Sequence, residues 1–187
     1  MISMNKTDQI RFYYETVLSE ALKNADLLSA DSLKSFNEEI LKQYQPESKD
    51  AVMDLLNDFV QPRLKEKAKE SLALVAHFAT EETLKLPSHN NLTAVQTSEI
   101  INKAIDKTKK YFEEEHQKYV LYHLEAADIQ RGEGDVRELF NVDVPKVILD
   151  RVKNEIEEMV CKNPERFVNI SDVPNKSVVK TNKEPVR

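Results

Sequence analysis

The residues best suited to chemistry in this sequence are a glutamate and two histidines near the middle of the chain. Glu113 and His116 have the Glu-x-x-His spacing, which places a carboxylate and an imidazole on one face of a helix. Di-iron sites in helical bundles use such a pair on each of two helices, and the sequence holds no second copy. His123 would lie about 10 Å further along the helix axis, whereas helical zinc ligands are usually one turn apart. Glu113, His116 and His123 are therefore one candidate metal site, but packing of half-buried histidine rings accounts for the same pattern, and no cofactor is expected.

A second candidate site is the pair of helices predicted over residues 136–155, which includes most of the segment DVRELFNVDVPKVILDRVK. The apolar pattern predicts a short helix, a turn at Asn141 and a longer helix with Pro145 in its first turn. The segment resembles the helix-turn-helix of bacterial repressors and regulators, in which the second helix enters the major groove. The resemblance implies that Asn141, Lys146 and Arg151 would contact DNA.

Two positions and the local charge disfavour this DNA-binding interpretation. Arg137 stands where the motif has a small residue, and Asp150 stands where it has an aliphatic one. Asp143 and Glu155 belong to the helix that would face DNA, and carboxylates repel the phosphate backbone. Short helix pairs of this kind also occur as ordinary packing units. Packing is therefore the favoured interpretation, and nucleic acid is a disfavoured partner.

A helical stripe with one carboxylate in it runs along the middle of the chain. Its members are Ile101, Ile105, Thr108, Phe112, Glu115, Tyr119, Tyr122, Ala126 and Ile129. The spacing predicts one uninterrupted α-helix over about Ser98–Gln130, roughly 50 Å long. Such a helix exposes apolar surface unless a partner protein or a second copy of the chain covers it. Glu115, Tyr119 and Tyr122 are therefore the candidate partner-binding residues, with Glu115 expected to face solvent.

The composition favours helices throughout the chain. Only 2 of the 187 residues are Gly, and hairpins and phosphate-binding loops rely on Gly at positive φ, so sheet folds and nucleotide-binding loops are disfavoured. The net charge of −6 is a poor match to a general nucleic-acid binder. No apolar run is long enough to cross a membrane, and the N-terminus lacks the apolar core of a cleaved signal peptide. We therefore expect a soluble, cytoplasmic protein, although export without a cleaved signal would leave the same sequence.

Turn and capping signals predict the other helices. Helices are expected over about residues 8–26, 31–44, 48–60, 62–79 and 143–160. The expected N-cap residues are Thr7 or Asp8, Ser29 or Asp31, Thr80 and Asp143. Thr93 and Gln96 have the spacing of a capping box ahead of the long helix. Ser71–Ala79 is the least polar stretch and is expected to be the most buried.

These signals together predict an all-α fold, a bundle of about six or seven helices around one long helix. Residues 1–162 are expected to form a single helical domain, and if it is subdivided, the boundaries fall near 87–92 and 131–135. Residues 163–187 are a polar, Pro-containing tail that is expected to be largely disordered. Phe167, Val168 and Ile170 are the residues expected to dock this tail on the body.

No catalytic motif is found in the sequence, which has no Gly-rich loop, no Gly-x-Ser-x-Gly and no cysteine pair. Cys161 follows a predicted helix C-terminus, where the dipole disfavours a thiolate, so it is expected to be unreactive. Lys65, Lys67 and Lys69 are expected to form a solvated face. The leading prediction is a non-enzymatic helical module that binds another protein as an adaptor, inhibitor or regulator. The alternatives are a DNA-binding regulator and a helical metal protein or enzyme.

Overall fold

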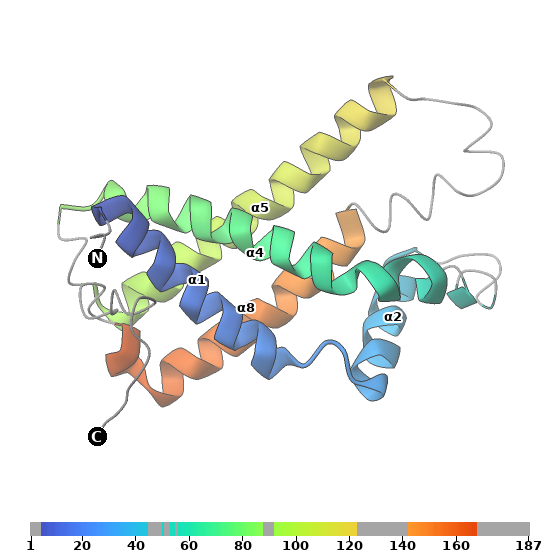
Figure 1. The fold of residues 1–187 in the computed structure, drawn as a ribbon, viewed down its shortest axis with the longest axis horizontal. Coiled ribbons are helices and arrows are strands. Elements are labelled where there is room, and N and C mark those ends of the chain that lie inside the picture. The colour runs from blue at the N-terminus through green and yellow to red at the C-terminus, as the bar shows by residue number, and fades with distance from the viewer. Residues whose placement is uncertain are drawn as a thin grey trace.

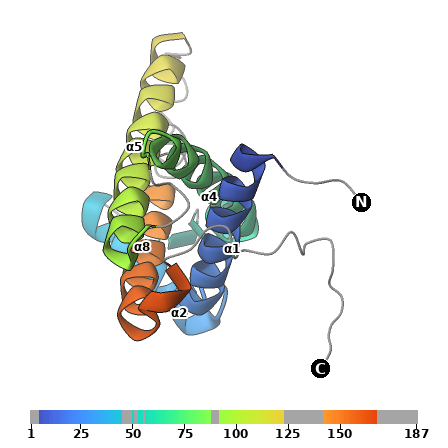
Figure 2. The same ribbon diagram turned by 90° about the vertical axis from the view of Figure 1, so that its left-hand side faces the viewer.

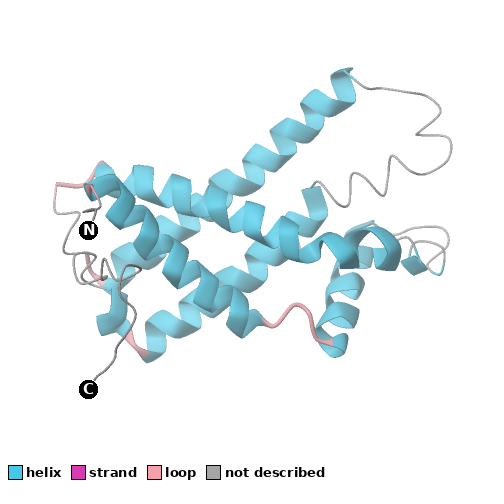
Figure 3. Ribbon diagram, in the orientation of Figure 1, coloured by secondary structure: helices cyan, strands magenta, loops and turns pink. Residues whose placement is uncertain are grey.

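The computed structural model describes residues 5–44, 50, 53–54, 56–87, 92–122 and 142–167. These residues form helices joined by loops and contain no β-strand, which confirms the all-α prediction (Figure 3). The helical elements are α1 (Lys6–Ala25), α2 (Ala30–Tyr44), the π-helical turn η1 (Leu56–Val60), α4 (Gln61–Leu84), α5 (Ala94–Tyr122), α8 (Val144–Lys162) and the 3-10 turn η3 (Pro164–Phe167). In this part of the chain, no helix is both long and apolar enough to cross a membrane.

The predicted all-α bundle that includes the long helix is confirmed within the described residues, and α8 packs against more of its elements than the long helix does. α8 contacts α1, α2, α4, α5 and η3, and Figures 1 and 2 show it grouped with α1, α4 and α5. Its buried side chains include Val147, Ile148, Leu149, Val152 and Ile156. These residues point in several directions around the helix axis, because α8 has neighbours on several sides.

The long helix is confirmed as uninterrupted within the described residues. It runs from Ala94 to Tyr122, a length of roughly 44 Å, and so begins before the expected Ser98. The expected extension over residues 123–130 lies outside the described residues. Up to Phe112 the helix buries one face in the bundle, whereas from there to Lys118 its side chains are half-buried or exposed. Figure 1 shows this end of α5 projecting away from the other helices.

The capping box ahead of the long helix is confirmed in full. The Gln96 N–H donates to Thr93 Oγ1 at 3.1 Å, and the Thr93 N–H donates to Gln96 Oε1 at 2.9 Å. Each side chain thus satisfies a backbone N–H of the other residue near the helix start. Ser29 plays the predicted role ahead of α2, where its hydroxyl accepts from the Ser32 N–H at 3.3 Å.

Two of the expected N-caps are wrong, and a third, Asp143, stands at the N-cap position of α8 without a side-chain capping bond. At the start of α1, Asn5 rather than Thr7 or Asp8 accepts a backbone N–H, because the helix already begins at the following residue. Asp143 makes no side-chain capping bond, because its own backbone is helical, with φ −76° and ψ −39°. Thr80 lies inside α4, where its hydroxyl donates to a backbone carbonyl one turn earlier.

The apolar stretch Ser71–Ala79 is buried on one face of α4 only. Ala73 and His77 lie on the opposite, exposed face. Further along the same helix, Thr83 reaches α1, where its Oγ1 lies 2.6 Å from the Tyr14 hydroxyl in a fully buried hydrogen bond. This bond fixes the spacing between the middle of α1 and the C-terminal end of α4.

Phe167 docks on the body, as expected. Its side chain is buried in the core cluster, and its carbonyl accepts a hydrogen bond of 2.8 Å from the Thr97 hydroxyl near the start of α5. The rest of the predicted tail, residues 168–187, lies outside the described residues.

Candidate functional site

The candidate partner-binding residues lie on the projecting end of α5. Glu115 faces solvent, and Lys118 Nζ donates to its Oε1 at 3.2 Å. Tyr119 and Tyr122 belong to α5 by their backbone, but their side chains lie outside the described residues. A partner surface made of these three side chains therefore stays a prediction.

A candidate metal ligand and a candidate DNA contact form an ion pair with each other. Glu113 Oε1 lies 2.6 Å from Lys146 Nζ, which joins α5 to α8. One turn earlier on α5, Lys109 forms an ion pair with Asp150 of α8. The two pairs have opposite polarity, so a one-turn shift between the helices would bring like charges together. We conclude that these residues help to fix the antiparallel register of α5 and α8.

The other candidate ligands do not join Glu113 in a described site. His116 is half-buried on α5, and His123 lies outside the described residues. Within the part of the chain that the structure describes, no group of three or more His, Cys, Asp or Glu side chains is placed to hold a metal ion. Cys161 is a free, exposed cysteine near the end of α8.

Arg151 is held by α2 and has little freedom to reach a ligand. Its side chain is only 16% exposed and lies 2.9 Å from Glu39 Oε1. Its guanidinium also lies over the Phe36 ring, 5.7 Å from the ring centre. The third candidate DNA contact, Asn141, lies outside the described residues. These contacts favour packing as the role of the α8 cations.

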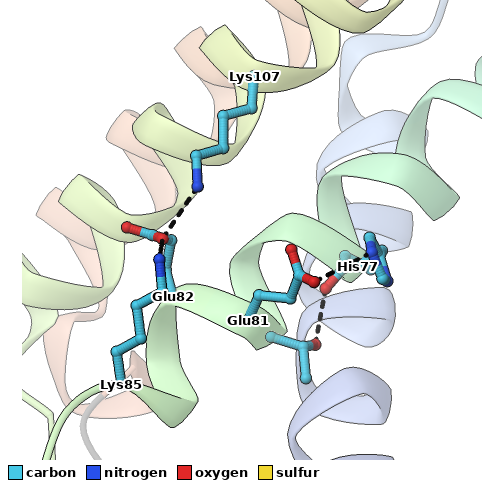
Figure 4. Close-up of polar contacts among 7 residues, drawn as sticks. His77, Glu81, Glu82, Lys85 and Lys107 are labelled. Atoms are coloured by element: carbon cyan, nitrogen blue, oxygen red, sulfur yellow. Dashed lines mark hydrogen bonds and ion pairs between the residues drawn. The ribbon is translucent and has the colours of Figure 1, made fainter.

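A second polar cluster fixes α4 against α5. Lys85 and Lys107 both donate to Glu82 Oε2, at 2.7 and 3.0 Å (Figure 4). The hydrogen bonds from Lys85 and Lys107 lower the pKa of Glu82 from 4.5 to about 2. Nearby, His77 pairs with Glu81 at 3.5 Å on the exposed face of α4.

The expected solvated lysine face of α4 is wrong for one member. Lys67 is buried, pairs with Glu70 at 3.3 Å, and lies 5.3 Å from the centre of the Phe112 ring. Lys65 and Lys69 are exposed, as expected, and point toward α1 rather than toward α5. The alternating lysines therefore belong to two different faces of the helix.

The feature that sequence reasoning missed is an apolar groove between α1 and α4, hereafter the α1–α4 groove. It consists of two hollows of about 310 Å³ each, and Ser19 and Leu22 line both of them. The other apolar residues that line the groove are Leu27, Leu28, Leu64, Ala68, Leu72 and Ala73. From Glu15 to Asp26 the groove follows α1 for roughly 16 Å, or about three helical turns.

The groove stays open because small side chains and a turn stand where large side chains would fill it. Ser19, Ala68 and Ala73 are short, so neither helix reaches across the gap. At the end of α1, Asp26 adopts φ 46°, which turns the chain sharply. The turn buries Leu27 and leaves Leu28 53% exposed at the mouth of the groove.

The edges of the groove carry lysines that make no ion pair within the described residues. Lys23, Lys65 and Lys69 are exposed there, together with the carboxylates of Asp26 and Glu15. By contrast, Lys107, Lys109 and Lys146 are paired with carboxylates of neighbouring helices. The groove edge therefore offers cations that a ligand can pair with.

One sequence signal could have indicated an exposed apolar side chain beside this groove, although not the groove itself. Leu27 and Leu28 are consecutive apolar residues in the turn after α1, and a single turn cannot bury two adjacent side chains against the same surface. One exposed leucine alone would be unremarkable. Here it lies at the end of an apolar groove, which single residues do not predict.

The chain was compared with protein families, curated proteins and solved structures, and no family model, curated protein or solved structure matches it.

Proposed function

We propose that this chain is a non-enzymatic helical module that binds another protein, as an adaptor, inhibitor or regulator. The observation that carries the proposal is the α1–α4 groove, an open apolar surface that ends at the exposed side chain of Leu28. Each hollow is at the lower limit of volumes for small-molecule pockets, about 300–1,000 Å³. An open groove of this volume suits side chains inserted by a partner better than an enclosed ligand.

Site-specific photocrosslinking tests this proposal. A photoreactive residue at position 28 or 73 lies in the groove, and one at position 95 is the matched control, because Val95 is an apolar residue that is 65% exposed outside it. The expected result is one protein captured from both groove positions and not from position 95. The purified partner should then bind the wild-type chain and lose affinity for Leu28→Asp. Capture that is equal at all three positions, or no protein captured, would refute the proposal.

The surface predicted on the end of α5 is tested with the same partner. If a Tyr119→Ala, Tyr122→Ala variant binds this partner as well as wild type does, the contact is made by the groove alone. Reduced binding would extend the interface to the projecting end of α5.

The DNA-binding and metal-binding alternatives gain no support from the described contacts. Retention on a DNA column at low salt that is lost in Lys146→Gln would favour the first. Bound transition metal in the purified protein that is lost in His116→Ala would favour the second.

A further inference from the structure

We propose that the occupant of the α1–α4 groove is an amphipathic helix of a partner protein whose apolar stripe is flanked by carboxylates. This inference rests on the proposed function and specifies the chemistry of the partner. It follows from the shape of the groove, from the residue types that line it and from the charges at its edges.

The shape and lining select a helix from the known modes of peptide recognition. Addition of a strand needs an exposed sheet edge, and the described residues form no strand. Grooves that bind polyproline segments are lined by aromatic side chains, and none of the described residues that line this groove is aromatic. An aliphatic groove between two helices is the surface that receives the apolar face of a third helix. Its length of about three turns matches apolar anchors at i, i+4, i+7 and i+11 of the incoming helix.

The charges at the groove edges indicate which residues should flank the apolar stripe of the partner helix. Lys23 projects from α1, and Lys65 and Lys69 project from α4, so cations stand on both sides of the apolar floor. They make no ion pair with described residues, and a partner carboxylate would not have to displace one. Asp26 and Glu15 lie at opposite ends of the stretch of α1 that lines the groove. The three lysines outnumber the two carboxylates, so the groove as a whole favours acidic flanks, and a basic residue is tolerated beside Asp26 or Glu15.

Two synthetic helical peptides of about fourteen residues would test this inference. Both carry leucines at the four anchor positions, and they differ only in having glutamate or lysine beside them. Fluorescence anisotropy with the full chain should show the glutamate peptide binding about threefold to tenfold more tightly, because exposed ion pairs contribute modestly. The preference should shrink as salt is raised.

Chain variants locate the binding and supply its controls. Leu28→Asp should weaken binding of the glutamate peptide by about tenfold or more. Val95→Asp changes an apolar residue that is even more exposed but lies outside the groove, and it should bind as wild type does. Lys65→Glu with Lys69→Glu should reverse the preference between the peptides. The matched control is Lys103→Glu with Lys110→Glu, which changes two exposed lysines of α5 and should leave the preference intact.

Several results would overturn the inference. These are no binding of either peptide, equal or tighter binding of the lysine peptide, and equal loss in the two aspartate variants. Dimerisation of the chain that Leu28→Asp abolishes would assign the groove to a second copy instead. The proposed function fails separately, because photocrosslinking asks whether any protein occupies the groove, whereas the peptides ask which flanking charge it accepts.

Discussion

Replacing Tyr14 by Phe removes one hydroxyl from the core and leaves the ring in place. The Tyr14 hydroxyl and Thr83 Oγ1 lie 2.6 Å apart, and both residues are fully buried. A buried polar group that loses its partner costs about 1–3 kcal/mol. The Thr83 hydroxyl has an alternative acceptor in the carbonyl four residues earlier, as Thr80 and Thr108 show in their own helices. We therefore expect Tyr14→Phe to destabilise the fold by only about 1–1.5 kcal/mol.

Replacing the other partner of this hydrogen bond, Thr83→Val, should cause a larger loss of stability. It leaves the Tyr14 hydroxyl in the core, and a tyrosine hydroxyl cannot turn back to its own helix backbone. Burial also raises the pKa of the Tyr14 hydroxyl well above its ordinary value, so ionisation offers no relief. We expect a loss of about 2–3 kcal/mol. The double variant removes both polar groups and should be more stable than the sum of the single losses predicts, by about 1 kcal/mol or more.

Urea denaturation followed by far-UV circular dichroism measures these differences. The midpoints should shift while the m-values stay constant, because the surface exposed on unfolding does not change. Tyr111→Phe is the matched control, since Tyr111 is exposed on α5, and it should change stability by less than about 0.5 kcal/mol. Additive single effects would refute the hydrogen bond between Tyr14 and Thr83. A larger loss in Tyr14→Phe than in Thr83→Val would refute the role of the alternative acceptor.

Three further predictions concern the polar contacts between and within helices. The folded-state pKa of Glu82 lies near 2, below its ordinary 4.5, so its stabilising effect is complete above about pH 4.5 and is lost as the pH falls toward 2. Glu82→Gln should lower stability at pH 7 by about 0.5–1 kcal/mol and flatten this acid dependence in denaturation curves, and an unchanged acid profile would contradict it. Thr93→Ala should cost about 1 kcal/mol in the same assay through loss of the capping box, with Thr93→Ser retaining most of the stability. Arg151→Met should cost about 1–2 kcal/mol, and a neutral result would show that the contacts with Glu39 and Phe36 contribute nothing.

The parts of the fold that follow from local signals could be predicted from the sequence. The capping box of Thr93 and Gln96 depends on spacing within one turn, and the uninterrupted path of α5 past Glu115 depends on helical periodicity without Pro or Gly. The burial of Phe167 follows from a short apolar group, Phe167, Val168 and Ile170, in an otherwise polar tail. Each of these features is decided by residues close together in the chain.

The features that depend on how helices meet were not predictable in the same way. The contacts of α8 with five other described elements arise because its apolar residues point in several directions, whereas the sequence pattern indicated a single apolar face. Lys67 belongs to an alternating run that looks solvated, yet its ammonium packs over Phe112 from another helix. The α1–α4 groove depends on Ser19 and Ala68 being short at facing positions of two helices. In all three cases the residues that meet are far apart in the sequence, so the sequence pattern does not show that they are in contact.

The two candidate binding surfaces, the cations of α8 and the α1–α4 groove, differ in how many ion pairs a ligand would have to break. To bind DNA through Lys146 and Arg151, the chain would have to give up ion pairs with Glu113 and Glu39, and would leave those carboxylates beside the phosphate backbone. The lysines of the α1–α4 groove require no such exchange within the described residues. An acidic helix docked there would gain ion pairs and cover exposed apolar surface in the same step. Protein binding at the groove is therefore the favoured function, since it breaks none of the described contacts that hold the bundle together.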